Sequence, residues 1–188
     1  MGKRARWCEV SYSSVIPLLG IVAYSGTGKT TLLKQLIPYL NSQGIRVGLI
    51  KHTHHDVDVD TPGKDSFELR KAGAYQTMVA SNQRWALMTE TPTLERLNLQ
   101  YLASRFDSTS LDIILVEGFK HEEIDKIALY RAGITKPLEG LMEGNVIAVA
   151  SDSSLNHSFP TLDLNNTPAI GQFIIDWLAK NDLSRPDF

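Results

Sequence analysis

Residues 23–31 read Ala23-Tyr24-Ser25-Gly26-Thr27-Gly28-Lys29-Thr30-Thr31. The stretch follows the phosphate-loop pattern G-x-x-x-x-G-K-[ST], in which glycines let backbone N–H groups turn toward phosphate oxygens. Gly28, Lys29 and Thr30 match this pattern, whereas Ala23 stands where the first glycine is expected. An apolar run precedes the stretch and an amphipathic run follows it, which is the strand and helix that such a loop requires. The sequence therefore predicts a P-loop that binds a nucleoside triphosphate.

Two side chains of this loop are expected to act directly on the nucleotide. In P-loops the lysine pairs with the β- and γ-phosphates and the Ser or Thr hydroxyl ligates Mg²⁺, so we predict these roles for Lys29 and Thr30. The N-terminus of the following helix adds partial positive charge. The alternative is a glycine-rich turn with an exposed lysine, which the flanking strand and helix disfavour. The predicted phosphate-binding residues are Ser25, Gly26, Thr27, Gly28, Lys29, Thr30 and Thr31.

Outside the loop, short apolar runs alternate with amphipathic ones. Residues 15–23 and 45–51 are predicted strands, and we expect the second to lie beside the first. A helix over residues 29–40 separates them, with one apolar stripe, and a last helix begins at Thr167-Pro168. Further strands are expected at 111–116, 126–130 and 146–150. This alternation predicts an α/β fold of the P-loop NTPase type, with a mostly parallel sheet flanked by helices.

The middle of the chain carries different signals. Asp65-Ser66-Phe67-Glu68 matches a capping box that opens a short helix, and Gly73 ends that helix. Residues 75–80 and 84–89 read as two strands around a polar turn, which predicts a β-hairpin. Thr91-Pro92 is typical of a helix start. The buried side of that helix is marked by Leu94, Leu97, Tyr101 and Leu102.

Composition restricts the class of protein. The chain has 188 residues, of which 43% are hydrophobic and 21% charged, as in ordinary soluble domains. Its net charge of −2 argues against a general nucleic-acid binder, which normally carries a strongly basic face. No stretch approaches the roughly 18 continuous apolar residues of a membrane span. We therefore expect neither nucleic acid nor a membrane as partner.

Domain organisation and location follow from similar features. Residues 1–14 are predicted to be a flexible extension, and residues 15–188 a single P-loop nucleotide-binding domain. Cys8 is the only cysteine, so an intrachain disulfide and a multi-thiolate zinc site are both excluded. The basic N-terminus lacks the apolar core of a signal peptide. These features predict a cytoplasmic protein.

A run of histidines and aspartates follows the second predicted strand. It reads His52-Thr53-His54-His55-Asp56-Val57-Asp58-Val59-Asp60. In an extended segment, alternate residues from His52 to Asp60 share one face. The run leaves the carboxyl edge of the sheet, where α/β proteins bind ligands. We therefore predict a nucleotide-responsive segment, with His52 at the nucleotide and Asp58 and Asp60 at Mg²⁺. An inert polar loop and a transition-metal site are the alternatives.

Two acidic residues close later strands. Glu117 ends the most apolar strand, next to a glycine, which favours a second carboxylate near Mg²⁺ over a mere strand cap. Asp152 follows the strand at 146–150, where GTP-binding P-loop proteins place an aspartate that accepts hydrogen bonds from guanine N1–H and its amino group. The pattern is [NT]-K-x-D, and Val149 and Ala150 fill its first two positions. Because only the aspartate matches, an ordinary loop carboxylate is an equal alternative.

Four segments together resemble the MobB family of molybdopterin-guanine dinucleotide biosynthesis adapter proteins. The resemblance spans residues 16–180, and the histidine-rich and Pro-Gly-Lys-Asp-Ser segments are more specific than the P-loop alone. The segments are 23–31, 49–56, 60–66 and 115–120.

The resemblance implies a GTP-binding homodimer that needs Mg²⁺. It would work in molybdenum cofactor biosynthesis beside the guanylyltransferase that attaches GMP to molybdopterin. The family hydrolyses GTP weakly, so we expect at most a slow Mg²⁺-dependent GTPase. The sequence agrees, because it shows neither a compelling water-positioning glutamine nor an arginine finger. Arg70, Arg84 and Arg131 could reach phosphate, but the sequence singles out none of them.

Two functions from other classes compete with the adapter hypothesis. A small-molecule kinase begins with the same strand, loop and helix, but it should carry an arginine-rich lid, which we do not find. A metal-delivery GTPase is suggested by the histidines at positions 52, 54 and 55.

Overall fold

The computed structural model describes residues 16–53, 58–92 and 97–182 of the chain. These residues form two compact units. The main unit comprises the described residues up to His52 and from Asn98 onward, and the hairpin unit comprises those between Thr53 and Leu97. No helix within the described ranges is long and apolar enough to cross a membrane.

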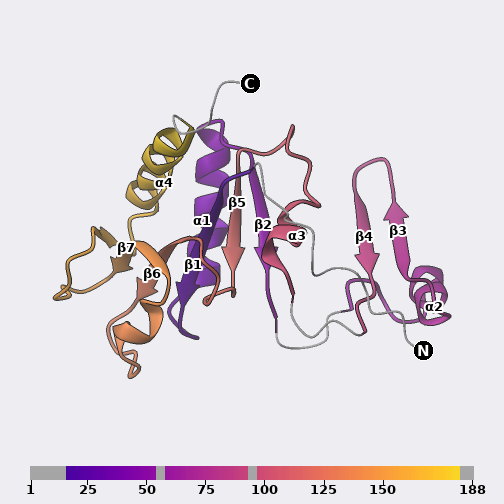
Figure 1. Cartoon of the computed structure of the whole chain (residues 1–188), viewed down its shortest axis with the longest axis horizontal. Coiled ribbons are helices and arrows are strands. Elements are labelled where there is room, and N and C mark those ends of the chain that lie inside the picture. The colour runs from indigo at the N-terminus through magenta and orange to yellow at the C-terminus, as the bar shows by residue number, and fades with distance from the viewer. Residues whose placement is uncertain (1–15, 54–57, 93–96, 183–188) are drawn as a thin grey trace. The chain divides into compact units, whose positions relative to one another are not determined.

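Six parallel strands form the sheet of the main unit. Their order in the sheet is β2-β5-β1-β6-β7-β8, and the arrows of β1, β2 and β5 point the same way in Figure 1. The predicted α/β fold with a parallel sheet is confirmed, although β8 was not predicted. The strands are β1 (Leu18–Ala23), β2 (Val47–Lys51), β5 (Ile113–Glu117), β6 (Asp125–Tyr130), β7 (Asn145–Ser151) and β8 (Thr161–Asp163).

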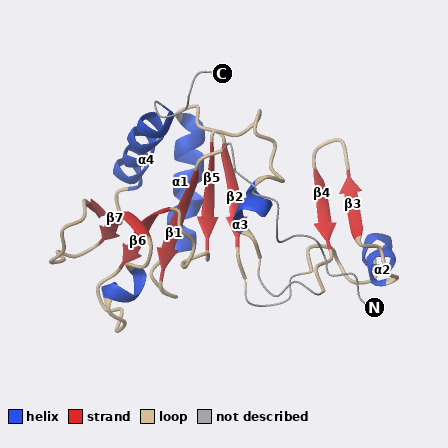
Figure 2. Ribbon diagram, in the orientation of Figure 1, coloured by secondary structure: helices blue, strands red, loops and turns tan. Residues whose placement is uncertain are grey.

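Two long helices, α1 (Lys29–Ser42) and α4 (Thr167–Asp182), pack beside each other (Figure 2). The predicted apolar stripe of α1 is buried in the core against the strands, together with that of α4. Leu36 and Leu40 on α1 and Ile170 and Ile174 on α4 are completely buried. This packing fixes the N-terminus of α1 at the end of β1, where the P-loop joins them.

The place of β2 differs from the prediction. β2 does not lie beside β1, because β5 lies between them, and Leu115 of β5 aligns with both Leu19 and Leu49. All five residues of β5 are buried, whereas Leu49 and Lys51 of β2 are exposed. The more apolar strand thus takes the inner position, and β2 forms the edge of the sheet.

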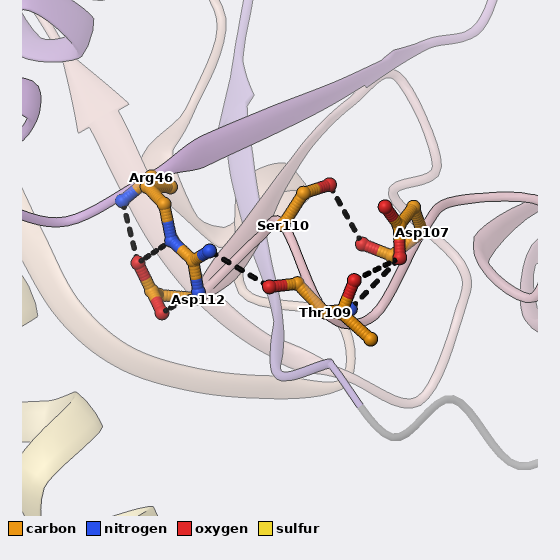
Figure 3. A network of polar contacts seen from close by, with 5 residues as sticks. All are labelled: Arg46, Asp107, Thr109, Ser110 and Asp112. Atoms are coloured by element: carbon orange, nitrogen blue, oxygen red, sulfur yellow. Dashed lines mark hydrogen bonds and ion pairs between the residues drawn. The ribbon is translucent and has the colours of Figure 1, made fainter.

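Arg46 and Asp112 hold this edge strand in register (Figure 3). The backbone N–H and Nε of Arg46 donate to Asp112 Oδ2 at 2.7 and 3.0 Å, and Nη2 donates to Oδ1 at 2.8 Å. Nη1 donates to the carbonyl oxygen of Thr109 at 2.8 Å. The guanidinium lowers the pKa of Asp112 from its ordinary value. Figure 3 also shows Asp107, which accepts hydrogen bonds from Thr109 in the same turn.

The shorter helices of the main unit differ from the prediction in their bounds and number. α3 (Leu99–Ala103) begins only after Asn98, whose side chain accepts a hydrogen bond from Tyr101 N at 2.9 Å. Thr91-Pro92 is therefore not the start of this helix, and Leu97 precedes it; Leu94 lies outside the described residues. The 3₁₀ helix η1 (Leu138–Leu141) was not predicted.

The hairpin unit contains α2 (Asp65–Lys71) and the antiparallel strands β3 (Gln76–Ala80) and β4 (Trp85–Thr89). The predicted hairpin is confirmed. The predicted helix also forms, but the capping box is wrong, because Lys64 is the N-cap and it makes no side-chain capping bond. Arg70 is buried and forms ion pairs with Asp58, Asp60 and Glu90, which join the start and end of the unit.

Candidate nucleotide-binding site

The carboxyl ends of the parallel strands bring the predicted site residues of the main unit to one edge of the sheet. Glu117 at the end of β5 aligns with Ile21 of β1 and with Lys51 of β2. Tyr130 and Ser151 pair at the ends of β6 and β7. The P-loop, His52, Arg131 and Asp152 all follow these strand ends directly. This is the edge at which α/β sheets bind ligands.

The P-loop has the backbone conformation of an anion cradle. Gly26 and Gly28 have φ values of 83° and 98°, which L side chains rarely adopt. The first bond of α1 runs from Leu32 N to Gly28 O at 2.9 Å, so the amides of residues 29–31 have no partner within the helix. Such amides and the positive end of the helix dipole together favour a bound phosphate.

The hydroxyl side chains of the loop differ in their exposure. Ser25, Thr30 and Thr31 are exposed, whereas Thr27 is buried with 1% of its surface exposed. The Thr27 hydroxyl has no hydrogen-bond partner among the described residues. A buried hydroxyl without a partner costs free energy.

Glu117 lies between two lysines at this edge. Lys29 Nζ lies 3.3 Å from Glu117 Oε1, and Lys51 Nζ lies 3.8 Å from Oε2. Glu117 is 8% exposed, so its charge is largely removed from water and needs these cations. The structure therefore brings together the P-loop lysine and the carboxylate that the sequence predicted for Mg²⁺. Carboxylate and hydroxyl oxygens are ligand types that Mg²⁺ prefers, and the roles of Glu117 and Thr30 at Mg²⁺ stay predictions.

His52 packs beside the backbone of Glu117 and Gly118. Its backbone N–H donates to the Glu117 carbonyl oxygen at 2.8 Å, and its ring lies 4.9 Å from that of Phe119. Gly118 between them has a φ of 96°, and a Cβ on it would lie 3.0 Å from His52 Cβ and from the His52 carbonyl oxygen. Only glycine suits this position, which explains the Glu117-Gly118 pair that the sequence displays.

Asp152 lies at the same edge and is held by two donors. Arg131 Nη1 donates to Asp152 Oδ2 at 3.0 Å, and the backbone N–H of Ala132 donates to Oδ1 at 2.7 Å. Arg131 Nε also donates to the Thr27 carbonyl oxygen in the P-loop at 3.0 Å. The structure thus singles out Arg131, whereas Arg70 and Arg84 belong to the hairpin unit.

Asp58 and Asp60 pair with Arg70 within the hairpin unit. Arg70 Nη2 lies 2.9 Å from Asp60 Oδ1 and 2.6 Å from Asp58 Oδ1. Hydrogen bonds to Asp60, Glu90 and Asp58 raise the pKa of Arg70. The Mg²⁺ role of Asp58 and Asp60 stays a prediction. His54, His55 and Asp56 lie outside the described residues. Within the described ranges, no three His, Cys, Asp or Glu side chains form a group that could hold a metal ion.

A comparison with family models identifies the relatives of this fold. The MobB model, described as molybdopterin guanine dinucleotide synthesis protein B, matches residues 18–152. The chain belongs to the MobB family. The match runs from β1 to Asp152 and so includes the P-loop, Glu117 and Arg131. The MobB resemblance that the sequence motifs indicated is confirmed.

Individual MobB proteins are similar over most of the chain. The molybdopterin-guanine dinucleotide biosynthesis adapter protein of Escherichia coli K12 is 62% identical over 170 residues, which cover 90% of this chain and 97% of that protein. The Haemophilus influenzae protein of the same name is 52% identical, covering 87% and 90%. A crystal structure of molybdopterin-guanine biosynthesis protein B has a TM-score of 0.71 at 26% identity, covering 86% and 99%.

Arg131 lies at the candidate site although no local sequence pattern marks it. From the sequence it is one of three arginines that could reach phosphate, with Arg70 and Arg84. The signal that identifies it is the pairing of β6 with β7, in which Tyr130 aligns with Ser151 and so places Arg131 beside Asp152. Pairing between strands that are distant in sequence cannot be read from local patterns.

Proposed function

We propose that this chain binds GTP with Mg²⁺ at its P-loop and serves as an adapter in molybdopterin guanine dinucleotide biosynthesis. The observation that carries the nucleotide site is the 3.3 Å ion pair of Lys29 with Glu117 at the N-terminus of α1. The adapter role is supported by the names of the relatives that are 62% and 52% identical to the chain. Both lines of support meet in the P-loop, which lies inside the MobB match.

The residues of the site have distinct tasks in this proposal. Lys29 can exchange Glu117 for phosphate oxygens, and the amides of residues 29–31 can donate to the same ligand. Glu117, when it no longer pairs with Lys29, is available with Thr30 to hold Mg²⁺. The bound ion would neutralise charge on the phosphates. His52 keeps the end of β2 against Glu117 through its backbone bond.

Guanine recognition is assigned to Asp152. An ionised carboxylate accepts hydrogen bonds only, and guanine offers it two adjacent donors that adenine lacks. A site built to pair with a donor group discriminates strongly against an analogue that lacks that group. We therefore propose GTP as the nucleotide, with hydrolysis that is slow at most.

Two interactions complete the proposal. We propose that the chain acts in the cytoplasm beside a molybdenum cofactor guanylyltransferase, and that it does so as a homodimer. The hairpin unit exposes Met78, Trp85 and Leu87, which supports association with a second copy. The adapter role predicts that GTP changes the affinity for the guanylyltransferase. Calorimetric titration of the two proteins with and without GTP measures this, and equal affinities would contradict a nucleotide-dependent adapter.

Titration of nucleotides into the full chain tests the site itself. Lys29→Ala should raise the Kd for GTP at least about tenfold, because it removes a charge-assisted contact. Lys34→Ala is the matched control, since Lys34 is exposed on the same helix, and its Kd should stay close to that of the parent. A Lys29→Ala variant that bound GTP as tightly as the parent would remove the phosphate assignment. Equal affinities of the parent for GTP and ATP, unaltered by Asp152→Asn, would remove the guanine assignment.

A further inference from the structure

Arg131 joins three segments of the main unit around the candidate site. Its Nε donates to the Thr27 carbonyl oxygen in the P-loop at 3.0 Å. Nη1 donates to Asp152 Oδ2 at 3.0 Å, and Nη2 lies 3.4 Å from Asn165 Oδ1 in the loop after β8. All three guanidinium nitrogens are thus engaged, each with a different segment. The arrangement differs from that of a surface arginine that extends into solvent.

The guanidinium also lies near the glycine at the start of α1. A Cβ placed on Gly28 would lie 3.6 Å from Arg131 Nη2 and 4.0 Å from Nε, which is van der Waals distance. Gly28 is the N-cap of α1 and has a left-handed conformation. Arg131 therefore contacts the P-loop at the Thr27 carbonyl oxygen and lies close to Gly28, the next residue. Its position depends on the position of this loop.

The same arginine helps to orient the Asp152 carboxylate. Oδ2 accepts from Arg131, and Oδ1 accepts at 2.7 Å from the N–H of Ala132, the next residue. Because both donors come from one dipeptide, the plane of the carboxylate is fixed relative to the end of β6. Each oxygen of an ionised carboxylate has two lone pairs, so both can still accept a further hydrogen bond. The carboxylate is thus positioned and still able to accept from guanine.

The strand pairing explains how this residue comes to lie here. Leu129 aligns with Ala150 and Tyr130 with Ser151, so Arg131 and Asp152 follow in step on neighbouring strands. Ala150 occupies the lysine position of the [NT]-K-x-D pattern. In this chain, the cation beside the aspartate comes from the adjacent strand and not from the motif itself.

We propose that Arg131 is a positioning residue for guanine recognition, because it bridges the Thr27 carbonyl and Asp152 and so holds the base-recognising carboxylate in place relative to the phosphate-binding loop. The inference rests on the proposed function, since it assumes GTP at the P-loop and guanine at Asp152. Arg131 acts on the base through Asp152. Its loss therefore weakens GTP binding more than ATP binding.

Nucleotide titrations of the full chain test this role. Arg131→Met keeps much of the length of the side chain and removes every donor. It should raise the Kd for GTP about tenfold and that for ATP less than about threefold, as expected for loss of a charge-assisted hydrogen bond that orients Asp152. Arg105→Met is the control, because Arg105 is exposed and lies over the Tyr101 ring at 5.9 Å; it should alter neither Kd. An equal increase for GTP and ATP, or no increase for either, would overturn the proposal.

Two further variants keep the test independent of folding and of the proposed function. Arg131→Lys retains the charge but not the forked donor geometry, so its GTP-to-ATP preference should fall between those of the parent and Arg131→Met. In an Asp152→Asn background, Arg131→Met should not reduce the preference for GTP over ATP any further. If Arg131→Met reduced this preference as much in that background as in the parent, the inference would be overturned. Failure of the proposed function would appear in the parent, as GTP binding that is absent or insensitive to Lys29→Ala. Failure of this inference would leave those results intact and appear only in the Arg131 variants.

Discussion

Lys126 on β6 is the clearest case of a single residue whose chemistry is set by burial. Its side chain is completely buried, and Nζ donates to the carbonyl oxygens of Lys120 and Glu143 at 2.6 and 3.1 Å. Burial lowers the pKa of Lys126 from its ordinary value of 10.5, and the nearby charges of Glu122, Glu123 and Glu143 oppose this shift. The ammonium is thus retained in the core because two loops offer it backbone acceptors.

The lowered pKa predicts how the stability depends on pH. Between the folded-state pKa and 10.5, the unfolded chain binds more protons at Lys126 than the folded chain does. The free energy of unfolding should therefore increase as the pH rises through that interval toward 10.5. Lys126→Met should flatten this increase, although it also leaves two carbonyl groups without their donor. Denaturant titrations of both proteins from neutral to alkaline pH measure the difference in slope. Parallel curves would show that Lys126 does not contribute to it.

At the scale of elements, the close contact between α1 and α4 depends on a glycine at position 171. Gly171 on α4 faces Tyr39 on α1, and a Cβ on Gly171 would overlap the tyrosine ring. Alanine is the better helix former by about 1 kcal/mol, so glycine here is explained by packing and not by helix propensity. The close approach lets Ile170 and Ile174 reach the core beside Leu36 and Leu40.

Gly171→Ala should therefore destabilise the protein despite the higher helix propensity of alanine. The overlap forces Tyr39 or α4 to move, and overpacking of this kind costs about 1–3 kcal/mol of unfolding free energy. Chemical denaturation measures the loss. A Tyr39→Leu/Gly171→Ala double variant is the control, because the smaller side chain gives the new methyl group room and the two effects should not add. Full additivity would show that the two residues do not compete for space.

The elements that the sequence predicted well are those with a strong local pattern. The stripes of α1 and α4 and the apolar run of β5 specify their own structure, and the P-loop motif places Lys29 at the start of α1. The misplaced start of α3 reflects Asn98, whose side chain caps this helix. The position of β2 and the pairing of Arg131 with Asp152 depend on which strands meet. That information lies in contacts between distant segments, so no local pattern reveals it.

At the scale of the whole molecule, the hairpin unit has too little interior to bury all its apolar side chains. Met78 pairs with Leu87 across the hairpin, and Ala80 pairs with Trp85 two residues further on, so these side chains share one face. Met78 and Trp85 are 59% and 65% exposed. A two-stranded hairpin with an exposed apolar face is marginally stable alone. Association of this face with a second copy would bury it, in agreement with the proposed homodimer.

Introducing charge at the centre of this face should therefore weaken the dimer without affecting the nucleotide site. In a Met78→Lys/Leu87→Lys variant, four lysines would meet at a two-fold contact, because each copy presents the same patch. The mass measured by sedimentation should then fall from that of a dimer toward that of the 20.9 kDa chain. The Kd for GTP should stay within about twofold of the parent value. This is well below the tenfold change that about 1.4 kcal/mol of lost binding free energy would cause. Leu69→Lys is the matched control, since Leu69 is 65% exposed on α2 of the same unit and outside the hairpin. A double variant that stayed dimeric would show that the copies meet elsewhere, and a monomeric parent would remove the homodimer itself.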